Sequence, residues 1–509
     1  MVKKWWLALL LPILVLTACD EIADAYDEYD EDDEAYYDDE AAYDEENFDA
    51  EFYDAAEAPA AGSDECPFDE PDDYDLTCGY LSVPENRAVS GSRQIQIAYV
   101  IVHADDGDEQ PPVVYLAGGP GGSAIDDFVA NPEGWEYPFT EERDLVLVDQ
   151  RGTGYSWPTL DCPELSEDVE FSDENPEVVC HDRLVDEGID LAAYNSAENA
   201  ADIAALRIEL GYDSWDLLGI SYGTRLALTI MRDHPEGIRS VVLDSVFPPN
   251  ADTPGEEALA PYSSLQRLFA DCAADDYCAD EYPDLETVFL ETVADMNDEP
   301  VDGVFGDDLV FLVTNALNDM SLIPLVPYVI YEVSAGNVDA LDDLEAALPA
   351  TLLLLFQDEA DRSDSEGMYN SVICHDEYVF GSFDEAENRA VGAIPEPLEA
   401  ALLQPVADLF QVCSFWGAGA AGSVENQAVH SDIPTLILAG LYDHATPPAW
   451  ADLTAQTLGH AYLFKFPDGG HSLLSDHQCA ISMTAEFLDE PDSAPDDSCL
   501  NEIEWPNFE

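Results

Sequence analysis

Basic residues are scarce in this 509-residue chain, which has 15 Lys and Arg against 111 Asp and Glu and a formal net charge of −96. Lysine is nearly absent, since Lys3 and Lys4 open the chain and Lys465 is the third. Such a charge repels nucleic acid and anionic lipid head groups and argues against a phosphate-backbone partner. Molar salt shortens the screening length to ~3 Å, so the composition resembles that of proteins from halophiles. An acidic protein from an ordinary habitat is the alternative.

Several ligand-binding patterns are also missing. No C-x-x-C pair is present, which argues against a zinc site. The glycine-rich run at 117–123 lacks the Gly-Lys-Ser/Thr ending of a phosphate loop, and the acidic run near the N-terminus lacks the central glycine of an EF-hand. We therefore expect neither a metal nor an organic cofactor. The 47% of hydrophobic residues can still fill a sizeable core.

The N-terminus has the features of a targeting segment. Two lysines precede an apolar stretch, Trp5 to Leu16, that is short for a membrane span. The run Leu16-Thr17-Ala18-Cys19 resembles the lipobox of bacterial lipoproteins, which predicts a signal peptide at 1–18 and acylation of Cys19. An ordinary signal peptide with a chance cysteine is the alternative. Residues 19–64 are strongly acidic and predict a disordered tether, so we expect an exported protein that is lipid-anchored to the bacterial cell envelope.

Cysteine usage agrees with export. Eleven cysteines leave ten once Cys19 is assigned to lipid, and an even number favours disulfides in an oxidising compartment. Many pairings are possible, and we predict the pairing of sequence neighbours. The expected disulfides are Cys66–Cys78, Cys162–Cys180, Cys272–Cys278, Cys374–Cys413 and Cys479–Cys499.

Beyond the tether, short apolar runs alternate with helical patterns, which is typical of an α/β protein with a mostly parallel sheet covered on both faces. We expect a first core segment at 65–246, a mainly helical cap insertion at 247–431 and a second core segment at 432–509. The predicted strands are Gln94–Val102 (an edge strand), Val113–Ala117, Leu145–Val148, Trp215–Leu218, Val241–Leu243, Thr435–Ala439 and Tyr462–Phe466.

The motif that indicates chemistry is Gly219-Ile220-Ser221-Tyr222-Gly223, between a predicted strand and the helical run Thr224–Arg232. A nucleophile on so sharp a turn needs small residues two positions away on either side, because the backbone there is crowded. The turn exposes the Ser221 hydroxyl and directs the amide of Tyr222 toward a developing oxyanion. Ser221 is therefore the predicted nucleophile.

Two loops that follow strands support this interpretation. The glycines of the run Gly118-Gly119-Pro120-Gly121-Gly122 expose backbone amides, and Gly119 is the predicted second oxyanion donor. The loop from Asp149 to Ser156 contains Arg151, which we expect to organise loops by hydrogen bonds rather than to contact substrate.

A serine nucleophile needs a base and an orienting carboxylate, which follow it along the chain in the order Ser, Asp, His when this turn motif is used. Asp443 follows one late strand and His471 follows the next, so we predict these two residues. Asp244, which follows the strand Val241–Leu243, is the alternative acid. Other histidines lie in less suitable contexts, and one of them is expected to point away from the site. These histidines are His444 (the one expected to point away), His460 and His477.

The chain resembles the proline iminopeptidases and tripeptidyl aminopeptidases among the α/β-hydrolases, over roughly residues 66 to 505. The stretch from Cys78 to Pro84 and Ser371-Val372-Ile373-Cys374 resemble the exported, tripeptidyl branch. Two departures are Ala117, where the family often has His, and His444, where Pro is common. The other matching stretches are Gly118 to Gly121, Asp149 to Ser156, Gly219 to Gly223, Gly440 to Pro448 and Gly470-His471.

The resemblance implies the α/β-hydrolase fold with a cap, and release of amino acids or short peptides from free N-termini through an acyl-enzyme on Ser221. A carboxylesterase or lipase with the same triad is the alternative, and an inactive ligand-binding lipoprotein is a third possibility. Epoxide hydrolase or dehalogenase chemistry would require Asp at position 221. A peptide substrate needs a carboxylate for its ammonium group, for which we predict Asp376 and Glu377 beyond Cys374. The sequence leaves the oligomeric state open.

Overall fold

The computed structural model describes residues 66–71, 74–104, 110–165, 175–346 and 364–508, all within one compact unit at 57–509. The predicted signal peptide, Cys19 and the tether lie outside the described residues. No helix in the described ranges combines the length and apolar character that a membrane crossing requires.

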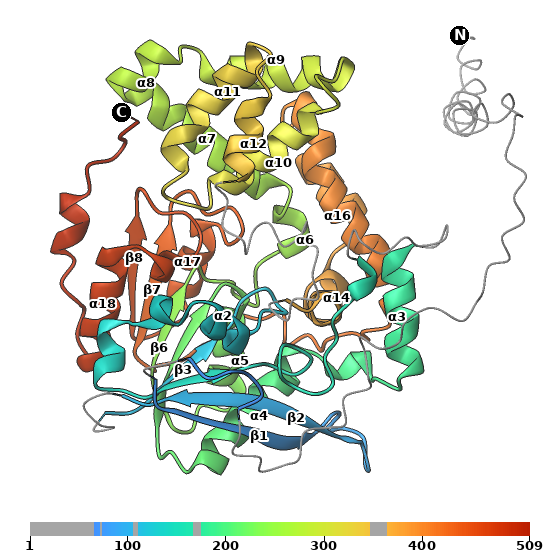
Figure 1. Ribbon diagram of the computed structural model, residues 1–509, viewed down its shortest axis with the longest axis vertical. Coiled ribbons are helices and arrows are strands. Elements are labelled where there is room, and N and C mark those ends of the chain that lie inside the picture. The colour runs from blue at the N-terminus through green and yellow to red at the C-terminus, as the bar shows by residue number, and fades with distance from the viewer. Residues whose placement is uncertain (1–65, 72–73, 105–109, 166–174, 347–363, 509) are drawn as a thin grey trace, which may run out of the picture. The chain divides into compact units, whose positions relative to one another are not determined.

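An eight-stranded sheet has the order β1-β2-β4-β3-β5-β6-β7-β8, in which all pairs from β4 to β8 are parallel (Figure 1). β1 and β2 pair antiparallel with each other, and β2 pairs antiparallel with β4. The α/β-hydrolase fold predicted from the sequence is confirmed. The strands are β1 (Leu76–Pro84), β2 (Gln94–Val102), β3 (Val113–Leu116), β4 (Leu145–Val148), β5 (Trp215–Ile220), β6 (Ile238–Asp244), β7 (Thr435–Gly440) and β8 (Ala461–Phe466).

One strand prediction was wrong in position. Gln94–Val102 was predicted as an edge strand because it alternates in polarity, but β1 pairs outside it along its whole length. The missed neighbour, Leu76–Pro84, contains Cys78, Gly79 and a terminal proline, which weaken its strand signal. At the edge of a sheet a terminal proline is tolerated.

Helices cover both faces of the sheet. On one face α4 (Ser196–Leu210) and α5 (Tyr222–Asp233) pack with strand residues such as Val114 and Leu217. On the other face α2 (Ala124–Ala130) and α18 (Gln478–Asp489) pack with their strand neighbours Val113 and Leu218. Adjacent strand residues point to opposite faces, which explains why the central strands are apolar throughout. Two further helices of the core segments are α3 (Pro176–Asp186) and α17 (Pro448–Ala455).

The described residues between β6 and β7 form helices and no strand of the sheet. In Figure 1 the helices α7 to α12 lie beyond the arrowheads of β7 and β8, at the carboxyl ends of the parallel strands. These helices are α6 (Thr253–Glu256), α7 (Leu259–Ala274), α8 (Asp276–Glu281), α9 (Leu285–Asp298), α10 (Gly306–Ala316), α11 (Val326–Ser334), α12 (Asp339–Glu345), α14 (Glu366–Asp376), α15 (Phe383–Ala390) and α16 (Glu396–Trp416). We refer to residues 247–431 as the insertion.

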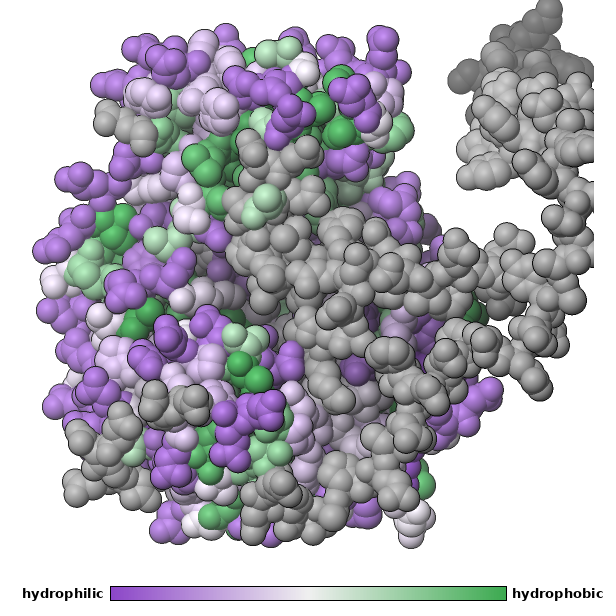
Figure 2. Space-filling view, viewed as in Figure 1, coloured by the Kyte–Doolittle hydropathy of each residue, from purple (hydrophilic) through white to green (hydrophobic). Residues whose placement is uncertain are grey.

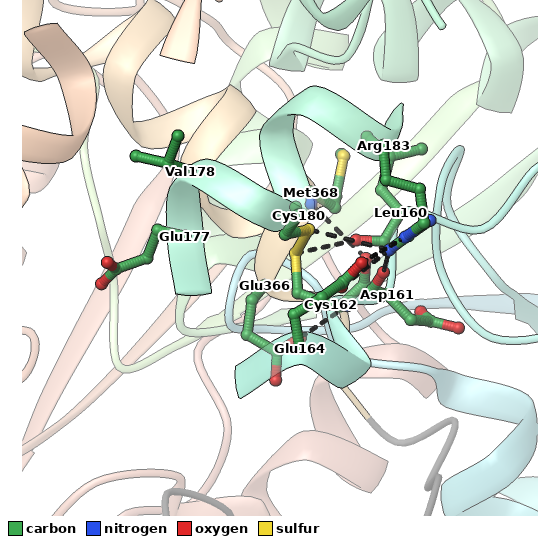
Figure 3. The surroundings of a disulfide bond; sticks show 12 residues. Leu160, Asp161, Cys162, Glu164, Glu177, Val178, Cys180, Arg183, Glu366 and Met368 are labelled. Atoms are coloured by element: carbon green, nitrogen blue, oxygen red, sulfur yellow. Dashed lines mark hydrogen bonds and ion pairs between the residues drawn. A yellow bond between two sulfur atoms is a disulfide. The ribbon is translucent and has the colours of Figure 1, made fainter. Parts of the chain in front are cut away.

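All five predicted disulfides are present, each between sequence neighbours. Such a number indicates folding outside the reducing cytosol. The sulfurs of Cys162 and Cys180 lie within 4.8 Å of a Glu164 carboxylate oxygen, which superficially resembles a metal site. Figure 3 shows the two sulfurs bonded to each other and Glu164 beside Arg183, so neither free thiolates nor an unpaired carboxylate are available there.

Hydrophilic residues cover most of the described surface that is visible in Figure 2, with small apolar patches between them. This distribution agrees with the acidic composition. Like charges on a protein surface repel one another, and salt screens that repulsion.

Candidate active site

The turn between β5 and α5 holds Ser221 in a strained conformation, with φ 55° and ψ −124°. A residue other than glycine adopts a positive φ only where its surroundings enforce it, at a cost of about 1–3 kcal/mol. The Ser221 amide donates to the Asp244 carbonyl oxygen at 3.0 Å, and the Ser221 carbonyl accepts from the amide of Thr224 at 2.9 Å. These bonds hold the turn at the carboxyl end of the sheet.

The two glycines of the motif are required by close contacts. A Cβ on Gly219 would lie 2.5 Å from the Gly223 carbonyl oxygen, and a Cβ on Gly223 would lie 1.9 Å from the Leu116 carbonyl oxygen. The backbone of α5 therefore approaches β3 and β5 more closely than any side chain permits.

His471 and Asp443, which follow β8 and β7, lie side by side. The Nδ1 atom of His471 is 2.9 Å from the Oδ2 atom of Asp443, and Asp443 also accepts from the amide and hydroxyl of Thr446 at 2.8 and 2.7 Å. Burial lowers the pKa of His471, but the charge and hydrogen bond of Asp443 outweigh burial, so this pKa is raised above its usual 6.5. Asp443 thus fixes the ring and favours its protonated form, as a general base requires.

Asp244 is placed differently from Asp443. Its Oδ2 atom accepts from the Leu474 amide at 2.8 Å, and its side chain is fully buried at the end of β6. Burial raises the pKa of Asp244 to about 6. Because the imidazole Nδ1 of His471 faces Asp443, Asp244 organises the loop after His471 rather than the ring itself.

The predicted oxyanion donors, Gly119 and Tyr222, flank Ser221. Gly119 has a φ of 98° and lines two cavities that both have Ser221 in their wall. A Cβ on the preceding Gly118 would lie 3.1 Å from the Ser221 Cβ, so the glycine loop passes directly over the serine. Tyr222 begins α5, where amides lack intrahelical acceptors, and its buried hydroxyl lies 2.9 Å from Ser196 Oγ.

A buried carboxylate joins the glycine loop to the loop after β4. Asp149 accepts from the Ser123 hydroxyl and from the amides of Ile125 and Tyr155 at 2.7 to 3.0 Å. Arg151 is fully buried and donates to Asp202 and to the carbonyl oxygens of residues 85 and 193. These contacts confirm the loop-organising role predicted for Arg151, and its side chain lines neither of the two cavities beside Ser221.

Two cavities meet at Ser221. The first cavity, of about 580 Å³, extends under the insertion and has Glu256, Glu257, Phe247 and Leu402 in its wall. The second cavity, of about 730 Å³, contains His471 in its wall. The two share Gly119, Ser221, Asn315 of the insertion, and His444 and Ala445, so a substrate bound across the serine can occupy both.

Asp376 and Glu377, predicted to bind a substrate ammonium group, line neither cavity. Glu377 forms a buried ion pair with Arg225 at 2.5 Å and accepts from the Thr253 hydroxyl at 2.7 Å. Asp376 accepts from the Ser196 amide at 3.0 Å and contacts His375. Because Arg225 and its neighbours already occupy these carboxylates, the structure gives them an internal role at the junction of α14 and α5.

Other carboxylates occupy the place expected for Asp376 and Glu377. Glu256 and Glu257 line the first cavity, where Glu256 accepts from the Trp450 indole and Glu257 from the Tyr378 hydroxyl, each at 2.5 Å. Burial raises the pKa of Glu257. They follow β6 closely along the chain, which is the available sequence signal, but in a chain with 111 acidic residues that position alone does not distinguish them.

His444 does not point away from the site as predicted. It lines both cavities, and its Nε2 atom is 3.2 Å from the Asn318 side-chain nitrogen. Burial lowers the pKa of His444 to about 4, so the ring is neutral near pH 7. Adjacent side chains point to opposite sides in a strand, but Asp443 and His444 lie in a loop, so both can face the same cavity region.

Comparisons with known proteins agree with this geometry. A family model described as the α/β hydrolase fold matches residues 111–323, and one described as TAP-like protein matches residues 403–499. Serine protease Hip1 of Mycobacterium tuberculosis (strain H37Rv) is 26% identical over 427 residues, which cover 76% of this chain and 80% of that protein. A putative hydrolase of Escherichia coli, YuaR, is 23% identical over 463 residues, covering 84% and 88%.

The third relative has a name that states which end of a peptide it acts on. A tripeptidyl aminopeptidase of Streptomyces lividans is 29% identical over 219 residues, which cover 39% of this chain and 41% of that protein. The chain is a serine hydrolase and belongs to the family of α/β-hydrolases that includes the tripeptidyl aminopeptidases and proline iminopeptidases.

Proposed function

We propose that this protein is an aminopeptidase that releases amino acids or short peptides from free N-termini, with Ser221, His471 and Asp443 as its triad. The observation that carries the proposal is the wall of the first cavity. It contains five carboxylates and, among the described residues, no Lys or Arg. The carboxylates are Glu256, Glu257, Asp307, Asp308 and Asp408.

In the proposed reaction, Ser221 Oγ attacks the scissile carbonyl carbon while His471 takes the hydroxyl proton. The amides of Gly119 and Tyr222 stabilise the oxyanion. His471 then donates its proton to the departing amine nitrogen, which leaves an acyl-enzyme. A water molecule, deprotonated by His471, attacks this ester, and the proton returns to Ser221 as the acyl group leaves. Asp443 holds the ring and stabilises its charge throughout.

The first cavity suits the acyl part of such a substrate. At an effective dielectric of ~20, an ammonium group ~4 Å from a carboxylate gains about 4 kcal/mol before desolvation is subtracted. The Glu256 and Glu257 side chains each have one donor on one oxygen, which leaves the other oxygen for the ammonium group. A volume of about 580 Å³ holds a short peptide rather than a long chain.

The experiment uses pairs of short peptidyl anilides that differ only in acetylation of the N-terminus, assayed at high salt. We expect the wild type to prefer the free amine strongly, and Glu256→Gln or Glu257→Gln to lose the free substrate without gaining the blocked one. Glu396→Gln, at the exposed start of α16, changes the same charge outside both cavities and is the matched control. Equal turnover of free and blocked substrates contradicts an aminopeptidase.

A carboxylesterase or lipase is the second candidate, because apolar side chains also line the first cavity, including Phe247, Phe311 and Leu409. An esterase would hydrolyse short or long acyl esters faster than any peptidyl anilide and would tolerate a blocked amine. The same panel therefore separates the two functions.

A further inference from the structure

The second cavity lies on the side of Ser221 where a leaving group departs, if the proposed mechanism holds. His471 must hand its proton to the departing group, so that group lies next to His471. His471, Ser472 and Leu473 line the second cavity and are absent from the wall of the first. The acyl part of the substrate then occupies the first cavity. The leaving group, which departs when the acyl-enzyme forms, occupies the second.

Asn318 presents an unused hydrogen-bond acceptor in this wall. It follows α10, is 8% exposed, and its backbone oxygen accepts from the His471 amide at 2.8 Å. The Asn318 side-chain nitrogen lies 3.2 Å from Nε2 of the neutral His444 ring, which can accept a hydrogen bond from it. The Oδ1 atom of Asn318 has no partner among the described residues. A buried acceptor of this kind costs free energy unless a ligand N–H reaches it.

Apart from the histidines, the charged side chains in the described wall of the second cavity are all negative. Its described wall contains Asp127, Asp319, Asp364 and Asp476 and no Lys or Arg. Asp319 and Asp476 both line this cavity, and burial together with the charge of Asp319 raises the pKa of Asp476. Such a space attracts cations and repels anions.

We propose that the second cavity is a binding site for a peptidic leaving group. Asn318 Oδ1 accepts a backbone N–H of that peptide, while Asp319 and Asp476 favour a cationic side chain next to the scissile bond and disfavour a carboxylate there. The preferred substrates are therefore extended peptides with Lys or Arg after the cleavage point, rather than peptides that end there in a single acidic residue.

The experiment uses peptides with one acyl part, followed by Lys, Gln or Glu and a C-terminal amide. We expect kcat/KM to fall in the order Lys, Gln, Glu, with about tenfold or more between the ends. The double variant Asp319→Asn/Asp476→Asn should bring the Lys to Glu ratio close to one. Asp492→Asn, an exposed aspartate that lines neither cavity, should keep the wild-type ratio.

A second arm tests Asn318 with an amide and an ester that share the acyl part, the ester having no leaving N–H. Asn318→Leu keeps the backbone contact to His471 and should raise KM for the amide several-fold more than for the ester. An equal loss on both substrates indicates a merely structural side chain and overturns this role. Peptide cleavage with equal rates for Lys and Glu overturns the charge preference alone. Ester cleavage without any peptide cleavage overturns the proposed function and this inference together.

Discussion

Residues 65–246 and the insertion at 247–431 have nearly equal numbers of acidic residues but differ in how many arginines they contain to pair with them. The first segment contains 39 Asp and Glu with 9 Arg, and the insertion contains 37 with 3 Arg. Eight of the nine arginines in the first segment form ion pairs within the described structure. Several of these arginines are fully buried, as Arg143, Arg151 and Arg225 show.

This difference in arginine content separates two kinds of carboxylate, those paired with arginine and those that line cavities. In residues 65–246, arginines neutralise carboxylates such as Asp202 on α4 and Asp216 on β5 and thereby join elements of the core. The insertion leaves Glu256, Glu257 and Asp319 in cavity walls without a described Lys or Arg. Carboxylates of the first kind stabilise the structure, and under the proposed function those of the second kind are available to a cationic group of the substrate.

The largest expected effect concerns Ser221 and Asp443 at the carboxyl ends of the parallel strands. Ser221→Ala should lower kcat/KM by about 10⁴–10⁶, and Asp443→Asn by about 10⁴, because each removes a part of the proposed triad. Asp244→Asn should cost far less, since Asp244 contacts the Leu474 amide rather than the His471 ring. Steady-state kinetics with circular dichroism as the folding control measures this. A larger loss for Asp244→Asn than for Asp443→Asn would reverse the assignment of the acid.

The same comparison explains what the sequence could predict. Ser221, Asp443 and His471 each follow a short apolar strand, and parallel strands bring their carboxyl ends to one edge, so local patterns suffice to place them. The disulfides also follow from local order, because each partner is the next cysteine along the chain.

The cavity residues depend on contacts that sequence order does not contain. Glu257 is separated by 121 positions from Tyr378, and Asn318 by 126 from His444. The position of Asp376 and Glu377 beyond Cys374 does not reveal that Arg225, on a helix of residues 65–246, pairs with Glu377. Helix packing in the insertion decides which of many carboxylates face a cavity, and no turn motif marks that choice.

The second effect concerns the link between the two regions. Glu377→Gln leaves Arg225 buried without its partner and should lower the free energy of unfolding by about 3–5 kcal/mol. Arg389→Gln removes the exposed pair with Asp252 inside the insertion and should cost about 0–1 kcal/mol. Urea unfolding followed by fluorescence measures both. A similar cost for the two variants means that burial of the Arg225 pair contributes little.

The third effect concerns salt. Because the insertion has few arginines, potassium chloride from about 0.1 M towards molar levels should raise the melting temperature and protect the insertion more than the sheet segment. Limited proteolysis at low salt should then cut first within 247–431. A melting temperature that is flat or falls over this range contradicts the prediction of a halophilic protein, and early cuts within 65–246 contradict the regional difference.

The smallest effect is a shift of the pH profile of kcat/KM. One measurement distinguishes titration of the residues at the carboxyl ends of the strands from titration of residues in the insertion. The base must be neutral to accept the Ser221 proton, so kcat/KM falls as the pH drops through the His471 pKa. Asp443 raises this pKa, and the acid limb should therefore lie above pH 6.5. Asp443→Asn removes the charge that raises the pKa and leaves the burial that lowers it, so the limb of the residual activity should move to lower pH. Glu257→Gln changes a carboxylate of the insertion and should leave the His471 limb where it is. A limb that moves with Glu257→Gln but not with Asp443→Asn would assign the titration to the insertion instead.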